Sequence, residues 1–367
     1  MIALTLAACL VAVAQAPAQE HAETPPQVEV VFVLDTTGSM GGLLEGAKKK
    51  IWSIASEIAR GKPSPRLKIG LVAYRDKGDA YVTRVTDLNE DLDKVYADLL
   101  AYRADGGGDT PENVRQAMHD ALTKIGWSKN KATLRIMFLV GDAPPHVDYT
   151  DVPTVEELCL TAVKAGIIIN TVRCGPNTET GKFWRQIADK SEGTFFSIDQ
   201  TGGVVAIATP FDKELGELSD KLGGTVVGFG DARRRAELER AEGGAKEYAP
   251  APKADRAVAK AASLRHSEDD LIDAIRDKRV KLEELKDDQL PEELRKMTPE
   301  ERKAHLEKKG KEREELRAKI VELSKKRDEF LAEEQRKRGA KDSFDSSVLE
   351  ALSEQAGKKG ISIPARK

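Results

Sequence analysis

Cysteine is scarce in this chain, with three residues among 367. So few thiols exclude a scaffold held by many disulfides and a zinc or iron–sulfur module built from cysteine clusters. The chain also lacks a surplus of one charge, because it has 59 Lys and Arg residues and 62 Asp and Glu residues. A protein that coats nucleic acid carries a strong basic surplus, so we expect no nucleic-acid partner.

Common catalytic motifs are also missing from the sequence. It has no G-x-S-x-G, H-E-x-x-H or C-x-x-C segment, the patterns of serine hydrolases, zinc proteases and thiol oxidoreductases. The segment GPNTETGKF at residues 175–183 differs from a phosphate-binding loop in its spacing and lacks the hydroxyl after Lys. We therefore expect a binding protein rather than an enzyme.

One long apolar run is present, at residues 2–14, and it is shorter than the roughly 20 residues that a membrane-spanning helix needs. Ala14, Ala16 and Ala18 follow with the spacing of a signal-peptidase site. Residues 1–18 are therefore predicted to be a signal peptide, although no Lys or Arg precedes the run. We expect an exported bacterial protein of the periplasm, the cell surface or the medium, whose mature chain has no transmembrane segment.

The three cysteines allow different roles. Cys9 follows Leu-Ala-Ala as in a bacterial lipobox, so a lipid anchor at Cys9 is an alternative to an ordinary apolar signal core. Cys159 lies on a predicted helix, and Cys174 ends a predicted strand. A disulfide between these two and a pair of separate buried thiols are both compatible with the sequence.

Short apolar runs alternate with helical stretches between residues 28 and 200, which is typical of a parallel sheet covered by helices on both faces. The predicted strands are 28–34, 67–74, 134–140, 167–172 and 194–198, with an edge strand at 81–85. The predicted helices are 42–60, 90–102, 111–125, 154–165 and 180–191. The expected fold class is α/β, with a doubly wound, mostly parallel sheet in a domain over residues 28–225.

The remaining residues are richer in charge. The Ala- and Pro-containing stretch 226–262 is predicted to be a linker, followed by a charged helical or coiled-coil region at 263–341 and a C-terminal tail at 342–367. A helix start is predicted at residues 298–301, which read TPEE. Two apolar stripes with coiled-coil spacing predict a helical hairpin, with a single solvated helix as the alternative; they are Leu271, Ile275, Leu282, Leu285 and Leu316, Ile320, Leu323, Phe330.

Oxygen-bearing side chains lie in three loops next to predicted strands or helices. Asp35, Thr37 and Ser39 alternate on the loop after the first strand, Thr110 precedes a helix, and Asp142 ends the strand at 134–140. Ligands of doubly wound sheets bind at the carboxyl ends of the strands, so these loops are expected to meet there. Hydroxyls and carboxylates suit Mg²⁺ or Mn²⁺ better than zinc.

The order of these residues resembles the metal-ion-dependent adhesion site of von Willebrand factor A (VWA) domains, which is D-x-S-x-S, then a distant Thr, then an Asp. Thr37 stands where Ser is usual. Four segments of the sequence also resemble the VWA subgroup that is sometimes attached to atypical kinases: DTTGSM, AYRD, GGGDTPE and GDAPPH. The resemblance implies an Mg²⁺ site, with Mn²⁺ or Ca²⁺ as alternatives, and an open coordination position for a carboxylate of a protein partner. Asp109 and His146 are further candidates for partner contact.

The function expected from these features is adhesion or assembly by an exported, metal-dependent binding protein. An accessory subunit or hydrolytic enzyme of the cell envelope, using the ion to hold substrate, is the alternative. A mainly structural role for the charged helices is the third hypothesis.

Overall fold

The computed structural model describes residues 25–108, 110–198, 207–263, 265–337 and 344–363. Within these residues six strands form one sheet in the order β3-β2-β1-β4-β5-β6. The strands are β1 (Gln27–Asp35), β2 (Arg66–Tyr74), β3 (Thr83–Asn89), β4 (Leu134–Gly141), β5 (Ile167–Cys174) and β6 (Phe195–Ile198). Every neighbouring pair is parallel except β2 and β3. The predicted α/β class and mostly parallel sheet are confirmed.

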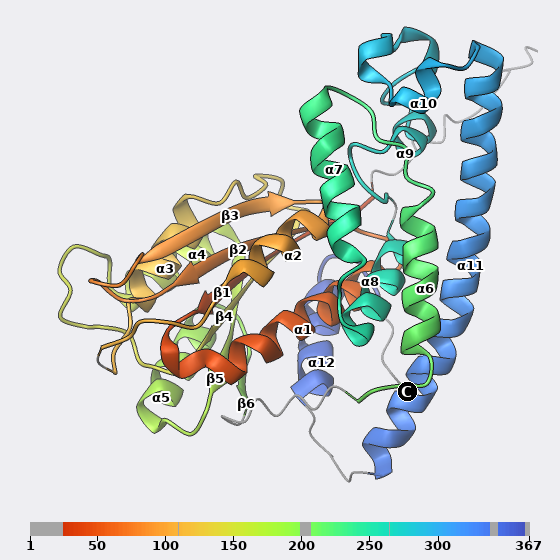
Figure 1. Cartoon of the computed structure of the whole chain (residues 1–367). Coiled ribbons are helices and arrows are strands. Elements are labelled where there is room, and N and C mark those ends of the chain that lie inside the picture. Colours follow the sequence, from red (N-terminus) through yellow and green to blue (C-terminus); the bar gives the residue numbers. More distant parts are fainter. Residues whose placement is uncertain (1–24, 109, 199–206, 264, 338–343, 364–367) are drawn as a thin grey trace, which may run out of the picture.

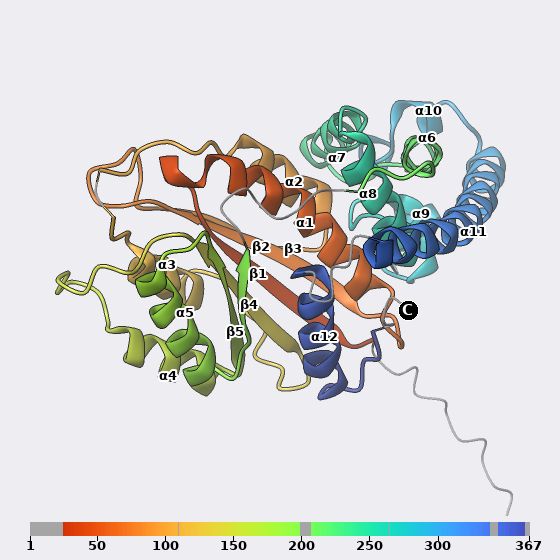
Figure 2. The ribbon, with the colours of Figure 1, turned by 90° about the horizontal axis from the view of Figure 1, so that it is seen from below.

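Helices cover both faces of this sheet (Figure 2). One face packs against α1 (Gly41–Ala59) and α2 (Leu92–Ala101), in a core that includes Trp52, Leu99 and Phe138. The other packs against α3 (Val114–Thr123), α4 (Val155–Ala165) and α5 (Thr178–Lys190), around Met118 and Trp184. Strands buried on both faces account for the near-continuous apolar runs of the sequence.

Further helices stand beside this α/β domain and form what we call the helical unit (Figure 1). It contains α6 (Asp212–Gly223), α7 (Ala232–Ala245), α8 (Pro250–Ala262), α9 (Leu271–Arg276), α10 (Glu292–Arg295) and α11 (Pro299–Lys337), with short 3₁₀ turns at Leu282–Glu284 and Asp287–Gln289. The predicted linker at 226–262 is wrong for most of its length, because α7 and α8 occupy it. Ala has the highest helix propensity, and Pro250 occupies the first turn of α8, where proline is tolerated.

The helical hairpin also differs from the prediction. Helix α11 begins as expected, where the Thr298 hydroxyl accepts a hydrogen bond from the Glu301 amide at 3.3 Å. However, Leu316 and Ile320 pack against α6 and α8, not against the other apolar stripe. That other stripe is α-helical only within α9, Leu282 begins a short 3₁₀ turn, and the leucines of the stripe pack with Val227, Leu290 and Leu294.

The end of the chain returns to the α/β domain. Helix α12 (Phe344–Gly357) buries Val348 and Leu352 in the same core as α1 and the sheet, and Lys62 pairs with Ser362 in a short antiparallel bridge. The predicted tail at 342–367 is therefore wrong for residues 344–363. The helical unit is an insertion in the sequence between β6 and α12 of one α/β domain.

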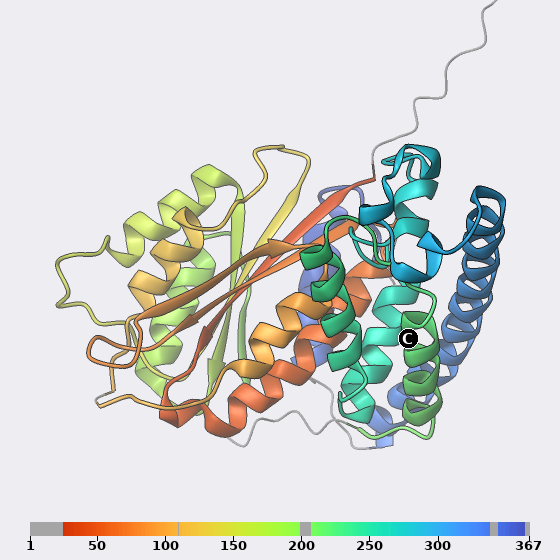
Figure 3. The ribbon, with the colours of Figure 1, turned by 45° about the horizontal axis from the view of Figure 1, so that its top comes forward.

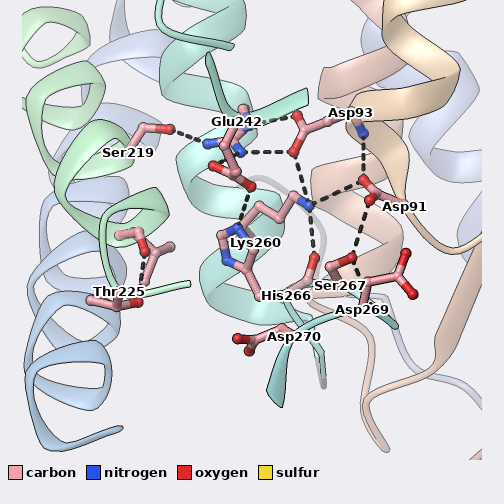
Figure 4. A network of polar contacts seen from close by, with 12 residues as sticks. Asp91, Asp93, Ser219, Thr225, Glu242, Lys260, His266, Ser267, Asp269 and Asp270 are labelled. Atoms are coloured by element: carbon pink, nitrogen blue, oxygen red, sulfur yellow. Dashed lines mark hydrogen bonds and ion pairs between the residues drawn. The ribbon is translucent and has the colours of Figure 1, made fainter. Parts of the chain in front are cut away.

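Buried ion pairs join the α/β domain to the helical unit. Helix α8 lies along α1 and α6 (Figure 3). Arg256 of α8 contacts Asp93 of α2 at 2.6 Å and Glu242 of α7 at 2.8 Å, and Lys260 contacts Asp93 at 3.0 Å (Figure 4). The pKa of Glu242 stays well below its usual range because His266 and Arg256 offset the effect of burial. These charges cross-link α2, α7 and α8.

The described cysteines Cys159 and Cys174 are free and buried, so they are two separate thiols. Burial raises the pKa of the Cys159 thiol to about 11. Cys9 and the predicted signal peptide lie outside the described residues. Among the described residues, no helix has both the length and the apolar character needed to cross a membrane.

Candidate metal centre

The first predicted loop begins where β1 ends. Oδ1 of Asp35 accepts hydrogen bonds from the Thr37 amide at 2.9 Å and the Thr37 hydroxyl at 2.6 Å. Ser39 follows in the short 3₁₀ turn Gly38–Met40, and its hydroxyl lies 3.3 Å from that of Thr37. Asp35 and Thr37 are buried, whereas Ser39 is exposed.

The second predicted carboxylate reaches the same loop. Strands β1 and β4 are parallel neighbours, so their carboxyl ends meet at one edge of the sheet. Asp142 directly follows β4, and its Oδ1 accepts a hydrogen bond from the Ser39 hydroxyl at 3.0 Å. Four of the five predicted ligand side chains are therefore joined by a continuous series of polar contacts: Asp35, Thr37, Ser39 and Asp142.

Thr110 is the fifth, and it lines an open pocket of about 580 Å³. Ser39, Thr110, Glu112 and Asp142 line the pocket together with residues 174–178, at and just after the end of β5. The structure thus places Thr110 at the same pocket as Ser39 and Asp142.

Glycines bring the Thr110 loop against the first loop. The Gly38 amide donates a hydrogen bond to the Gly106 carbonyl at 3.1 Å. Gly106 has φ +76°, and a Cβ there would lie 2.3 Å from the Asp79 carboxylate. A side chain at this position would be strained by the positive φ and would displace the Asp79 carboxylate, which accepts a hydrogen bond from the Gly107 amide.

The electrostatics of the site are dominated by acids. Burial raises the pKa of Asp35 to about 7, and burial also raises the pKa of Asp142. Burial, reinforced by Asp35 and Asp76, raises the pKa of Glu112 to about 9. Oδ2 of Asp35 and Oε2 of Glu112 are buried without a hydrogen-bond partner. Crowded, under-satisfied carboxyl groups of this kind are stabilised by a bound cation.

The donor set fits a hard cation. Among the described residues, no group of three or more His, Cys, Asp or Glu side chains is placed to hold a metal ion. Thr37, Ser39 and Thr110 offer hydroxyl oxygens at the same edge of the sheet as the carboxylates of Asp35 and Asp142. Oxygen donors of this type suit Mg²⁺, Mn²⁺ or Ca²⁺.

The two candidates for partner contact are placed differently. His146 does not line the pocket; its Nε2 lies 3.2 Å from Asp76, its Nδ1 2.8 Å from Asp148, and its ring stacks on Tyr149. Asp109 lies outside the described residues. Glu112 is at the pocket although it was not among the predicted residues, and its only signal in the sequence is its place two residues after Thr110.

Comparisons with known proteins agree with this architecture. The von Willebrand factor A domain family matches residues 29–209. An ariadne-like RING finger protein of Acanthamoeba polyphaga mimivirus is 31% identical over 119 residues, covering 32% of this chain and 11% of that protein. The human von Willebrand factor A domain-containing protein 7 is 33% identical over 120 residues, which cover 33% of this chain and 12% of that protein. The matches thus span about a tenth of the length of these relatives.

A solved structure, proximal thread matrix protein 1 from the mussel byssus with a zinc-occupied MIDAS motif, aligns with a TM-score of 0.38 and 12% identity. It covers 48% of this chain and 42% of that one. Proteins with this domain often bind other proteins. Residues 29–209 form a von Willebrand factor A domain, and the chain is a VWA-domain protein.

Proposed function

We propose that this chain is an exported binding protein whose VWA domain holds a divalent cation and binds a protein partner through an acidic side chain. The ligand set is Asp35, Thr37, Ser39, Thr110 and Asp142. Export rests on the sequence of residues 1–18 alone. Adhesion or assembly is the role that such a binding site serves.

The observation that carries the proposal is the connected series from Asp35 through Thr37 and Ser39 to Asp142, next to an open pocket. Asp35 is fully buried, and its Oδ1 accepts hydrogen bonds from both the amide and the hydroxyl of Thr37. Asp142 orients the hydroxyl of Ser39. Hydroxyls fixed in this way need no rearrangement to bind a cation, which favours binding.

The pocket leaves room for a partner group beside these hydroxyls. A bound cation would supply a positive charge there, and a carboxylate is the side chain that such a charge attracts most strongly. Ser39 and Thr110 are both exposed at the pocket, so a partner can reach that point.

Asp35→Asn tests the site. The amide keeps the shape of the side chain and can still accept from Thr37, but it removes a buried negative charge. We expect Mn²⁺ and Mg²⁺ binding, measured by calorimetry, to weaken by about a hundredfold or more. Capture of a partner from periplasmic extract should be lost with this variant and with chelator.

The matched control is Asp105→Asn, since the Asp105 side chain is 81% exposed and its backbone amide bonds to the first loop. It should bind cations like the unmodified protein. Equal cation affinity in Asp35→Asn and Asp105→Asn would refute the proposed site.

A further inference from the structure

Arg75, in the AYRD segment, is a buried cation beside the candidate metal centre that the proposed ligand set does not use. It directly follows β2, and only 5% of the residue is exposed. Its Nε donates a hydrogen bond to the Thr36 carbonyl at 3.1 Å, and its Nη2 donates to the Arg103 carbonyl at 2.9 Å. Because Thr36 lies between Asp35 and Thr37, the guanidinium contacts the backbone of the loop that carries these two predicted ligands.

The Thr36 carbonyl is also tied to a second loop. It accepts a hydrogen bond from the Asp105 amide at 3.1 Å as well as the one from Arg75. Arg103 and Asp105 both precede Thr110 in the same loop. Arg75 therefore holds the Thr110 loop and the first loop together through their backbones.

Aromatic packing fixes the guanidinium in this position. It lies over the ring of Tyr81, 4.7 Å from the ring centre, and the Tyr81 hydroxyl lies 2.7 Å from the Thr36 hydroxyl. The Asp105 carboxylate is 3.8 Å from Nη1 of Arg75 and its side chain is 81% exposed, so water screens this ion pair. Arg84 covers the same ring at 4.1 Å, but it is an exposed residue.

The charge of Arg75 by itself opposes a cation, because a guanidinium and a divalent ion repel each other. A contribution of Arg75 to cation binding must therefore come from the position in which it holds the loops. A planar guanidinium contacts two carbonyls with two separate nitrogens, a geometry that a single ammonium group does not reproduce. Loops that are already in place cost less ordering free energy when an ion binds.

We propose that Arg75 is a positioning residue of the cation site: it holds the Thr110 loop against the first loop before the ion binds. This inference rests on the proposed function. It gives the AYRD segment a role in assembling the site, and it makes cation affinity depend on a residue that is not a ligand.

Two substitutions separate geometry from charge. Arg75→Lys keeps the charge and loses the fork of donors, and Mn²⁺ binding, measured by calorimetry, should weaken by about tenfold. Arg75→Gln should also weaken Mn²⁺ binding, although it removes a charge that repels the ion, because the loops lose the same contacts. Arg84→Lys and Arg84→Gln are the matched controls, and both should bind Mn²⁺ like the unmodified protein.

Hydrogen–deuterium exchange in metal-free buffer separates positioning from a general structural role. In Arg75→Lys, exchange should rise several-fold at residues 36–40 and 103–108, where the Gly38 and Asp105 amides bond across the two loops. Exchange in strand β4 should stay unchanged. An equal rise in β4, or a variant that is unfolded without metal, would assign Arg75 a general structural role and overturn the proposal.

The remaining outcomes are distinct. If the unmodified protein does not bind Mn²⁺, the proposed function fails and this inference fails with it. If the unmodified protein binds Mn²⁺ and Arg75→Lys binds it as tightly as Arg84→Lys, the cation site stands and the role of Arg75 alone is overturned. Tighter binding by Arg75→Gln than by the unmodified protein would also overturn that role, because Arg75 would then act through its charge.

Discussion

Arg256 illustrates how single residues decide the packing of this protein. Its guanidinium is almost completely buried, yet it contacts Asp93 with two nitrogens, at 2.6 and 2.7 Å, and also reaches Glu242 and Ser219. The planar fork of Arg matches such a set of acceptors, which a Lys ammonium could not contact at once. Each partner comes from a different helix, so one side chain fixes the spacing of four helices.

Arg256→Met should therefore be strongly destabilising. Truncating one member of a buried ion pair leaves the other charge without compensation, and we expect a loss of about 3–5 kcal/mol in the free energy of unfolding. Urea denaturation followed by circular dichroism measures it. Arg233→Met removes an exposed pair with Glu237 and should leave the unfolding midpoint nearly unchanged. A similar midpoint for both variants would contradict the role given to Arg256.

At the scale of elements, close backbone approach explains where glycine is needed. Gly193 lies between α5 and β6, and a Cβ there would come within 1.9 Å of the Ile169 carbonyl oxygen. By contrast, Gly310 lies inside the 39-residue helix α11, where a Cβ would meet only Ile272, at 3.8 Å. Glycine is required at the first position and costs helix stability at the second.

Alanine substitution at these two positions should have opposite effects. Gly193→Ala must push β6 away from β5, and we expect it to destabilise the protein by about 1–3 kcal/mol. Gly310→Ala should stabilise α11 by up to about 1 kcal/mol. Thermal unfolding of the two variants gives the signs directly. A raised melting temperature for Gly193→Ala would show that glycine is not required there.

At the scale of the whole molecule, the helical unit interrupts the α/β domain, because it lies in the sequence between the VWA match at residues 29–209 and helix α12. Helix α12 supplies Val348, Leu352 and Ala356 to the core beneath the sheet, after a helical unit that lies between β6 and α12 in the sequence. Gln355 and Asn170 exchange two side-chain hydrogen bonds, at 3.1 and 2.9 Å, in the buried interface. The last helix is thus part of the domain that carries the candidate metal centre.

Leu352→Ala tests this architecture. Leu352 is 1% exposed, and its truncation should cost about 2–5 kcal/mol through lost burial and a new cavity. Leu160→Ala, at a leucine that is 58% exposed, is the matched control and should cost far less. Equal losses in urea denaturation would show that α12 does not belong to the core.

The VWA domain could be predicted from local patterns. Buried parallel strands require continuous apolar runs, and the loops at their carboxyl ends meet because neighbouring strands are parallel. For this reason the sequence alone was enough to expect Asp35, Ser39 and Asp142 to converge. Glu112 could not be expected there, because its backbone is tied to the Pro144 carbonyl and the His146 amide, which belong to another loop.

For the charged residues after position 225, the sequence by itself determined only that helices with interspersed charges would form. Composition and helix-start signals are local, so they say nothing about what those helices pack against. Whether these charges face solvent was decided by tertiary structure. Arg256, Lys260 and Arg313 are buried because acids on other elements lie within ion-pair distance of each. Desolvating a charge is favourable only when such partners are in place, and a local sequence pattern does not contain that information.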